Sequence, residues 1–167
     1  IQVTHLGRRT SWSKEDWLPV VAPSPVREPA HRAFPKAMED WDFERVITAY
    51  ADSAERVKAA GLDGIELECA SHLIAHFWSP ATNKREDEYG GSLENRMRLV
   101  NDILTAIRKR IGHEFIVGVR MVCDEVWDKG LSRDEGVEIA RRLKAGGLID
   151  FVNVIRGHVS EDEALSH

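Results

Sequence analysis

The sequence predicts an α/β fold built from parallel strands, and three observations support this prediction. Short apolar runs alternate along the chain with longer segments that have the 3.6-residue periodicity of amphipathic helices. Residues that typically begin or end helices flank the helical segments. The resulting order of strand, helix, strand, helix, strand, helix and strand is typical of right-handed βαβ units, in which consecutive strands run parallel.

The first 60 residues predict one short strand, a long irregular segment and one helix. Residues 1–5 have strand character. Residues 6–40 contain all but one of the six prolines, so we expect a surface excursion there rather than a regular element. Residues 41–60 predict an amphipathic helix, and Gly61 is placed to cap its C-terminus.

The rest of the chain continues the alternation with three strands and two helices. Strands are predicted at residues 64–68, 115–121 and 149–155, and helices at residues 92–111 and 132–145. Ser92 and Ser132 are suited to cap the N-termini of the two helices. In the helix at residues 132–145, acidic residues near the N-terminus and basic residues near the C-terminus match the helix dipole.

Two architectures contain such βαβ units, and the polar residues of the strands favour one of them. A doubly wound sheet is buried on both faces, which makes its strands almost wholly apolar. In a barrel, one face of each strand meets the outer helices and the other faces the interior. The strands here carry polar residues that can face inward: Gln2, Thr4, Glu66, Glu68, Arg120 and Asn153. We therefore expect an α/β barrel of the (β/α)8, or TIM-barrel, class.

Only about half of such a barrel is expected in this chain. A complete barrel has eight strands and typically about 250 residues, whereas four strands are predicted here. No composition shift indicates a linker, so residues 1–167 are expected to form one partial barrel domain. A piece of a longer protein is the simplest interpretation.

Composition and charge argue against several function classes. The chain is 43% hydrophobic and 31% charged, with a formal net charge of −5. No basic cluster is interleaved with aromatic residues, so we expect no nucleic-acid partner. No apolar run reaches the ~20 residues that cross a bilayer, so we expect no membrane partner. Cys69 and Cys123 form neither a disulfide framework nor a metal-ligand spacing, and we expect no metal and a reducing, cytoplasmic setting.

An ordered set of short motifs resembles the Old Yellow Enzyme family of flavin-dependent oxidoreductases. The matching segments are residues 1–8, 77–80, 83–85, 87–92, 94–96 and 115–120. They correspond to barrel strands three to six of that family. Glu68, the Trp78-Ser79-Pro80 run and the ending at residues 154–158 resemble more narrowly the branch that acts on N-methylated amines. This branch comprises dimethylamine and trimethylamine dehydrogenase-like proteins and N-methylproline demethylases.

The resemblance implies FMN as cofactor, with Gln2 and Arg120 as cofactor-binding residues. It places Gln2 at the pyrimidine edge of the flavin, although bonding within the barrel is the plainer role for this amide. Arg120 ends an apolar strand, where a buried guanidinium needs an anionic partner. The resemblance places it beside the flavin N1 and C2 carbonyl region, where negative charge accumulates on reduction. A structural ion pair with Glu66 or Glu68 is the alternative.

Glu68 departs from the common pattern of the family. Enone reductases place His at this position and His or Asn three residues later, and these two donors hold a carbonyl oxygen. An ionised carboxylate cannot donate, so Glu68 is expected to bind a cationic amine as a catalytic and substrate-binding residue. The alternative is that Glu68 pairs with Arg120 or Arg156 and contacts no substrate.

Four further residues are candidates for the site. His72 lies near the second donor position and is suited to accept or relay a proton. Because it begins a short helical turn, a role as a capped or surface residue is the alternative. His158, at the end of the last strand, is a candidate catalytic residue. Arg156 is suited to bind a substrate carboxylate, with a loop ion pair as its alternative. Trp78 is a candidate substrate contact, with packing as its alternative.

Other motif residues are expected to have structural roles. His5 and Arg8 are interpreted as supporting or loop-anchoring residues, and His76 as structural. Residues 83–96 identify the family best, yet they are expected to form a salt-linked scaffold through Arg85, Asp87 and Arg96.

The expected reaction is oxidative demethylation of a small N-methylated amine or amino acid. In it, a hydride passes from the N-methyl group to flavin N5, and water hydrolyses the resulting iminium. An NAD(P)H-dependent enone or 2,4-dienoyl-CoA reductase is the first alternative. The second is a non-catalytic half-barrel with weak or no FMN binding, should the 167 residues be the whole molecule. A 4Fe-4S cluster is expected only in a missing C-terminal part, and association into a homo-oligomer is left open.

Overall fold

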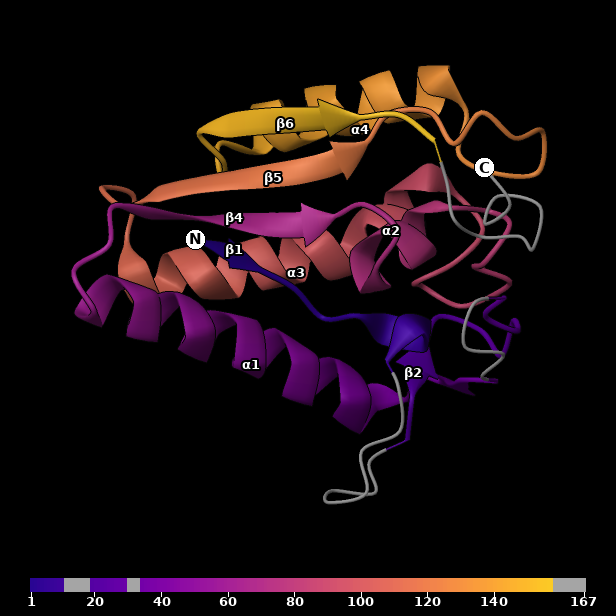
Figure 1. Cartoon of the computed structure of the whole chain (residues 1–167), viewed down its shortest axis with the longest axis horizontal. Helices are drawn as coiled ribbons and strands as arrows, with labels where there is room; N and C mark the ends of the chain where they lie inside the picture. Colours follow the sequence, from indigo (N-terminus) through magenta and orange to yellow (C-terminus); the bar gives the residue numbers. More distant parts are fainter. Residues whose placement is uncertain (11–18, 30–33, 158–167) are drawn as a thin grey trace.

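The computed structural model describes residues 1–10, 19–29 and 34–157, and a parallel sheet forms its centre (Figure 1). The strands are β1 (Gln2–Val3), β4 (Gly64–Cys69), β5 (Ile116–Val122) and β6 (Phe151–Ile155). They are hydrogen-bonded in the order β1-β4-β5-β6, and every neighbouring pair is parallel. The carboxyl ends of β4, β5 and β6 therefore point the same way, as the arrowheads in Figure 1 show. All four strands were predicted.

The helices also agree with the predictions. The long ones are α1 (Asp40–Ala59), α3 (Leu93–Ile111) and α4 (Arg133–Gly146), and α2 (Leu73–Trp78) is the short turn that follows β4. Ser92 and Ser132 cap α3 and α4 by accepting hydrogen bonds from backbone N–H groups three residues later. Among the described residues, no helix is long and apolar enough to span a bilayer.

The expectation that residues 6–40 lack regular structure was wrong in part. This segment contains a 3₁₀ turn, η1 (Gly7–Arg9), and two two-residue strands, β2 (Val21–Ala22) and β3 (Lys36–Ala37), which pair in parallel. Strands of two residues have too little length to show a periodicity in the sequence. The buried Val21 and Ala22 of β2 join the core beside α2, so the segment packs on the molecule.

The two faces of the central sheet differ, as a barrel requires. On the face toward the helices, alternate residues of β4 and β5 have at most 2% of their surface exposed: Ile65, Leu67, Cys69, Val117, Val119 and Met121. On the other face, Gln2 and Thr4 are exposed, as are Ile116 and Phe151 at 46% and 41%. Helices therefore cover one face within the described residues, whereas a doubly wound sheet carries them on both.

Candidate active site

Polar side chains from all four strands gather on the face of the sheet away from the helices. The register places Gln2 beside Glu66, Glu68 beside Arg120, and Arg120 beside Asn153. Since side chains alternate between the two faces of a strand, these polar residues share the face opposite Leu67 and Cys69. We call the set formed by Gln2, Glu66, Glu68, Arg120 and Asn153 the interior polar layer.

Glu66 lies in the middle of the interior polar layer. Its Oε1 accepts a hydrogen bond from Nε2 of Gln2 at 2.8 Å, and its Oε2 accepts one from Nδ2 of Asn153 at 3.1 Å. One carboxylate thus joins amides from β1 and β6. Gln2 has the interior position that the sequence predicted, and Glu66 is its partner.

Glu68 is buried, with 6% of its surface exposed, and has partners for both carboxyl oxygens. Oε1 accepts a hydrogen bond from the backbone N–H of Ala70 at 2.8 Å, and Oε2 lies 3.6 Å from Nε of Arg120. Burial raises the pKa of Glu68, while the Ala70 N–H and the positive charge of Arg120 act in the opposite direction. The carboxyl group faces the interior and not the helix layer.

Arg120 has an anionic partner. Within the described residues its side chain is 38% exposed, because it lies on the face of the sheet that a complete barrel encloses with further strands. The anion beside it is Glu68, so the ion pair that we considered as an alternative is present. An exposed guanidinium does not exclude a second anionic contact, because Arg carries five donors.

The two histidines near the carboxyl ends of β1 and β4 are held in neutral form. Nδ1 of His72, the N-cap residue of α2, lies 3.0 Å from Oγ1 of Thr4. Burial is the main factor that lowers the pKa of His72, and it lowers the pKa of His5 to about 4. Nδ1 of His5 accepts the backbone N–H of Gly7 at 3.0 Å, which fits the supporting role expected for this residue.

The structure does not bring the other predicted site residues into the interior polar layer. Arg156 donates from Nε to Oδ2 of Asp124 at 3.0 Å, and 67% of its side chain is exposed, so the loop ion pair is the arrangement observed. Trp78 is fully buried and offers no accessible surface to a substrate. His158 lies outside the described residues, and its catalytic role stays a prediction.

Arg8 is a loop anchor. It is 1% exposed and donates to the backbone oxygens of Val26 and Arg27 at 3.3 and 2.8 Å. It also donates from Nε to Nε2 of the buried His76 at 3.3 Å. Burial and the neighbouring Arg8 charge hold the pKa of His76 well below its usual value, so the imidazole accepts this bond in neutral form.

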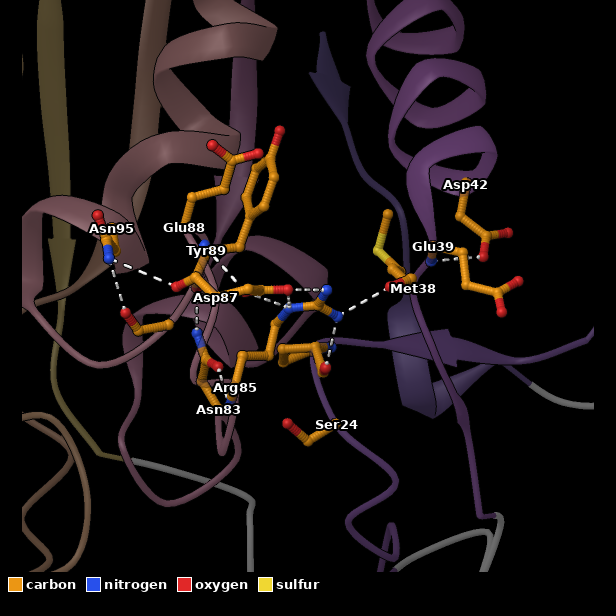
Figure 2. A network of polar contacts seen from close by, with 12 residues as sticks. Ser24, Met38, Glu39, Asp42, Asn83, Arg85, Asp87, Glu88, Tyr89 and Asn95 are labelled. Carbon is orange, nitrogen blue, oxygen red and sulfur yellow. Dashed lines mark hydrogen bonds and ion pairs between the residues drawn. The ribbon is translucent and has the colours of Figure 1, made fainter.

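The family-identifying loop is a scaffold of polar contacts, as its charges predicted. Figure 2 shows Arg85 between the carboxylate of Asp87 and the backbone oxygen of Met38, which accepts from Nη1 at 2.8 Å. The Asn83 amide donates to the backbone oxygens of Phe77 and Tyr89, both at 2.8 Å. The loop therefore joins the end of α2 to the segment before α1.

Arg96 continues this scaffold on α3. Its guanidinium donates to the backbone oxygen of Trp78 and pairs with Glu135, which also belongs to the capping box of α4. The ion pair links the first turns of two neighbouring helices. Arg96 is thus structural, as expected.

Sequence reasoning missed the connection between Glu66 and its two amide partners. Both Glu66 and Asn153 were noted as inward-capable, but neither was assigned to the site. The signal available was their alternation with buried apolar neighbours, which puts them on the face of Gln2 and Arg120. The contact itself depends on the strand register, which the sequence does not show.

A parallel sheet with helices on one face and a polar layer on the other defines part of an α/β barrel enzyme, whose sites form at the carboxyl ends of its strands. Residues 1–159 match the NADH:flavin oxidoreductase / NADH oxidase family, and the chain belongs to this family of flavin-dependent oxidoreductases.

Curated relatives extend the match over nearly the whole chain. The "Probable N-methylproline demethylase" of Rhizobium meliloti (strain 1021) is 60% identical over 99% of the chain and 24% of its own length. The "N,N-dimethylglycine/sarcosine dehydrogenase" of Chromohalobacter salexigens is 47% identical over 93% of the chain and 22% of its own length. The "Multifunctional alkene reductase/demethylase OYE" of Caballeronia cordobensis is 46% identical over 99% of the chain and 24% of its own length. The chain thus spans about a quarter of the length of these relatives.

Solved structures agree with the fold. Histamine dehydrogenase from Rhizobium sp. 4-9 matches with a TM-score of 0.83 and 30% identity, over 93% of this chain and 23% of its own. The old yellow enzyme homologue from Zymomonas mobilis matches with a TM-score of 0.81 and 26% identity, over 93% of this chain and 46% of its own. These likenesses confirm the predicted barrel class, of which the described sheet is a part.

Proposed function

We propose that the protein containing this chain is an FMN-dependent oxidoreductase that demethylates a small N-methylated amino acid. The observation that carries the proposal is the place of Glu68. Its carboxyl group lies at the carboxyl end of β4, on the interior face of the sheet, where a barrel enzyme binds its substrate. The relatives named for N-methylproline and for dimethylglycine and sarcosine support this substrate class.

The residues of the interior polar layer fit the edge of a flavin. Such an edge offers an N–H donor and carbonyl acceptors, and it gains negative charge on reduction. Gln2 is exposed and supplies an amide, while Arg120 is 38% exposed and supplies a guanidinium. They share one face on β1 and β5, with β4 between them. FMN, when bound, supplies the hydride acceptor.

The chain's own residues contribute binding and orientation. Glu68 attracts the ammonium group of the substrate, and the N–H of Ala70 keeps one carboxyl oxygen in place. Arg120 partly neutralises Glu68, so the attraction is weaker than that of an isolated carboxylate. His72 is neutral and can accept a proton, with Thr4 fixing the ring. Arg156 would bind the substrate carboxylate only after giving up Asp124, and His158 remains a candidate.

Reduction of an activated alkene with NAD(P)H is a second candidate, favoured by one observation. The raised pKa of Glu68 keeps more of the carboxyl group protonated than in an ordinary glutamate, and a protonated carboxyl can donate to a carbonyl oxygen. The relative from Caballeronia cordobensis is named for both reactions, and others are named NADH oxidase and NADPH dehydrogenase.

Turnover with N-methylproline and with cyclohexenone separates the two candidates. We expect the full-length holoenzyme to prefer N-methylproline. In Glu68→Gln, kcat/KM for the amine should fall by about tenfold to a hundredfold, because the neutral amide no longer attracts the ammonium group. Glu114→Gln, a matched change at an exposed site, should keep the parent value. A parent enzyme that prefers cyclohexenone, or a Glu68→Gln variant with unchanged amine kinetics, would overturn the proposal.

A further inference from the structure

We propose that Glu66 is a positioning residue that fixes the Gln2 and Asn153 amides with their NH2 groups toward β4 and their carbonyl oxygens away from it. The two hydrogen bonds, of 2.8 Å from Gln2 and 3.1 Å from Asn153, end on different oxygens of one carboxylate. Glu66 is thereby the shared acceptor of amides that come from opposite edges of the described sheet.

The chemistry of a carboxylate determines which way the amides turn. An ionised carboxyl group only accepts hydrogen bonds, whereas an amide presents NH2 on one side and a carbonyl oxygen on the other. Turning either amide around would place its carbonyl oxygen against the negative charge. Within the described residues, the Gln2 amide has Glu66 as its hydrogen-bond partner, and this charge-assisted bond orients it.

The contact between Asn153 and Glu66 spans β5, which lies between β4 and β6. Neighbouring strands are about 4.8 Å apart, so the two side chains together reach across about twice that distance. The residue beside Glu66 on β5 is Gly118. The ring of Phe151 takes the place of the missing side chain, because a Cβ atom at Gly118 would lie 2.1 Å from it, so this position is closed to larger residues.

The fixed orientation has a consequence for ligand selection, and this step rests on the proposed function. With its NH2 group engaged by Glu66, Gln2 keeps its carbonyl oxygen for a ligand, and a carbonyl oxygen pairs with a donor. The N3–H of a flavin pyrimidine edge is such a donor. Glu66 therefore makes the site selective for a ring that carries this hydrogen, although Glu66 need not touch the ring.

The test compares the dissociation constants of FMN and 3-methyl-FMN, which lacks the N3 hydrogen, by quenching of flavin fluorescence. We expect the full-length parent protein to bind FMN about tenfold more tightly than its 3-methyl derivative, the value of one hydrogen bond. In Glu66→Gln this ratio should fall toward one, because the new amide can donate as well as accept and lets Gln2 turn. Glu114→Gln should keep the parent ratio.

Three further variants test the interpretation. Gln2→Ala should abolish the preference for FMN over 3-methyl-FMN. Adding Glu66→Gln to Gln2→Ala should then leave the ratio of the two dissociation constants unchanged. Should Glu66→Gln fail to fold, Glu66→Asp is the substitute. Aspartate keeps the negative charge, but its shorter side chain moves the carboxylate away from both amides. We therefore expect a smaller preference for FMN over 3-methyl-FMN. If Glu66 has a purely structural role, its substitution should weaken the binding of FMN and of 3-methyl-FMN by the same factor.

The outcomes separate this inference from the proposed function. A parent protein that binds both flavins equally, or a folded Glu66 variant with the parent ratio, overturns the positioning role even if N-methylproline is turned over. A shifted ratio in Glu66→Gln supports it even if the enzyme acts on alkenes instead of amines. Failure of the parent to bind any flavin overturns both.

Discussion

At the scale of single residues, Glu68 is where burial and charge oppose each other. Its carboxyl group is buried beside an arginine that is itself partly exposed, so the ion pair lies between solvent and the sheet. Under the proposed function, the protonation of Glu68 decides whether the site presents a negative charge or a donor.

The raised pKa of Glu68 predicts opposite pH dependences for the two candidate reactions. Amine oxidation needs the carboxylate, so its kcat/KM should fall as the pH drops through a pKa above that of an ordinary glutamate. Any alkene reduction should rise over the same interval, because the protonated group donates. The measurement is a pH profile of both reactions in the parent and in Glu68→Gln, which should lose this transition. An identical acid limb in both proteins would refute the assignment.

A second residue-scale prediction concerns Asn83 in the loop scaffold. Replacing it by Ala removes the donors for two backbone oxygens, those of Phe77 and Tyr89. Unsatisfied buried acceptors destabilise a protein, and we expect the free energy of unfolding in urea to fall by about 1–3 kcal/mol. The exposed Glu86 in the same loop supplies the control, since Glu86→Ala should change it by less than about 0.5 kcal/mol. Equal stabilities would count against the scaffold role.

At the scale of elements, α4 packs closely on the chain that leaves β5. At Gly136, in its first turns, a Cβ atom would lie 2.0 Å from the backbone oxygen of Cys123. At Gly146, the last residue of the helix, a Cβ atom would meet nothing within 4 Å. In α4, close packing therefore requires glycine at position 136 but not at position 146.

These two glycines form a matched pair for a stability test. Gly136→Ala should destabilise the protein by about 1–3 kcal/mol, because helix and loop must separate to admit the methyl group. Gly146→Ala should stabilise it by about 0.5–1 kcal/mol, because alanine loses less backbone entropy in a helix. Urea unfolding of both variants measures the difference. Two shifts of the same sign would contradict the packing described here.

Predictability from sequence also depends on scale. The four strands of the central sheet and the three long helices were predicted because their apolar spacing is local, whereas the two-residue strands β2 and β3 were not. The alternation of Ile65 and Leu67 with Glu66 and Glu68 indicated which face is interior. The exposure of Arg120 was not predicted, since it depends on what covers the open face. The partner of Arg156 is Asp124, 32 residues away on a loop, and no pattern in the sequence brings the two together.

At the scale of the whole molecule, the described sheet presents a polar interior face with β1 and β6 at its edges. Eight strands close a barrel of this class, and the chain covers 24% of the relative named for N-methylproline. We therefore expect flavin binding to need the remaining strands, and a shorter piece to associate through its unpaired edges. Under the proposed function, the interior polar layer supplies one wall of the site.

The most direct test of the amine-binding account is anaerobic mixing of the full-length, flavin-loaded protein with N-methylproline, followed by the absorbance of the flavin. If Glu68 binds the amine, N-methylproline should bleach the flavin band without NADH or NADPH, and the bleaching rate at low substrate should fall about tenfold or more in Glu68→Gln. A flavin that stays oxidised with N-methylproline, yet is reduced by NADPH and reoxidised by cyclohexenone, would contradict it.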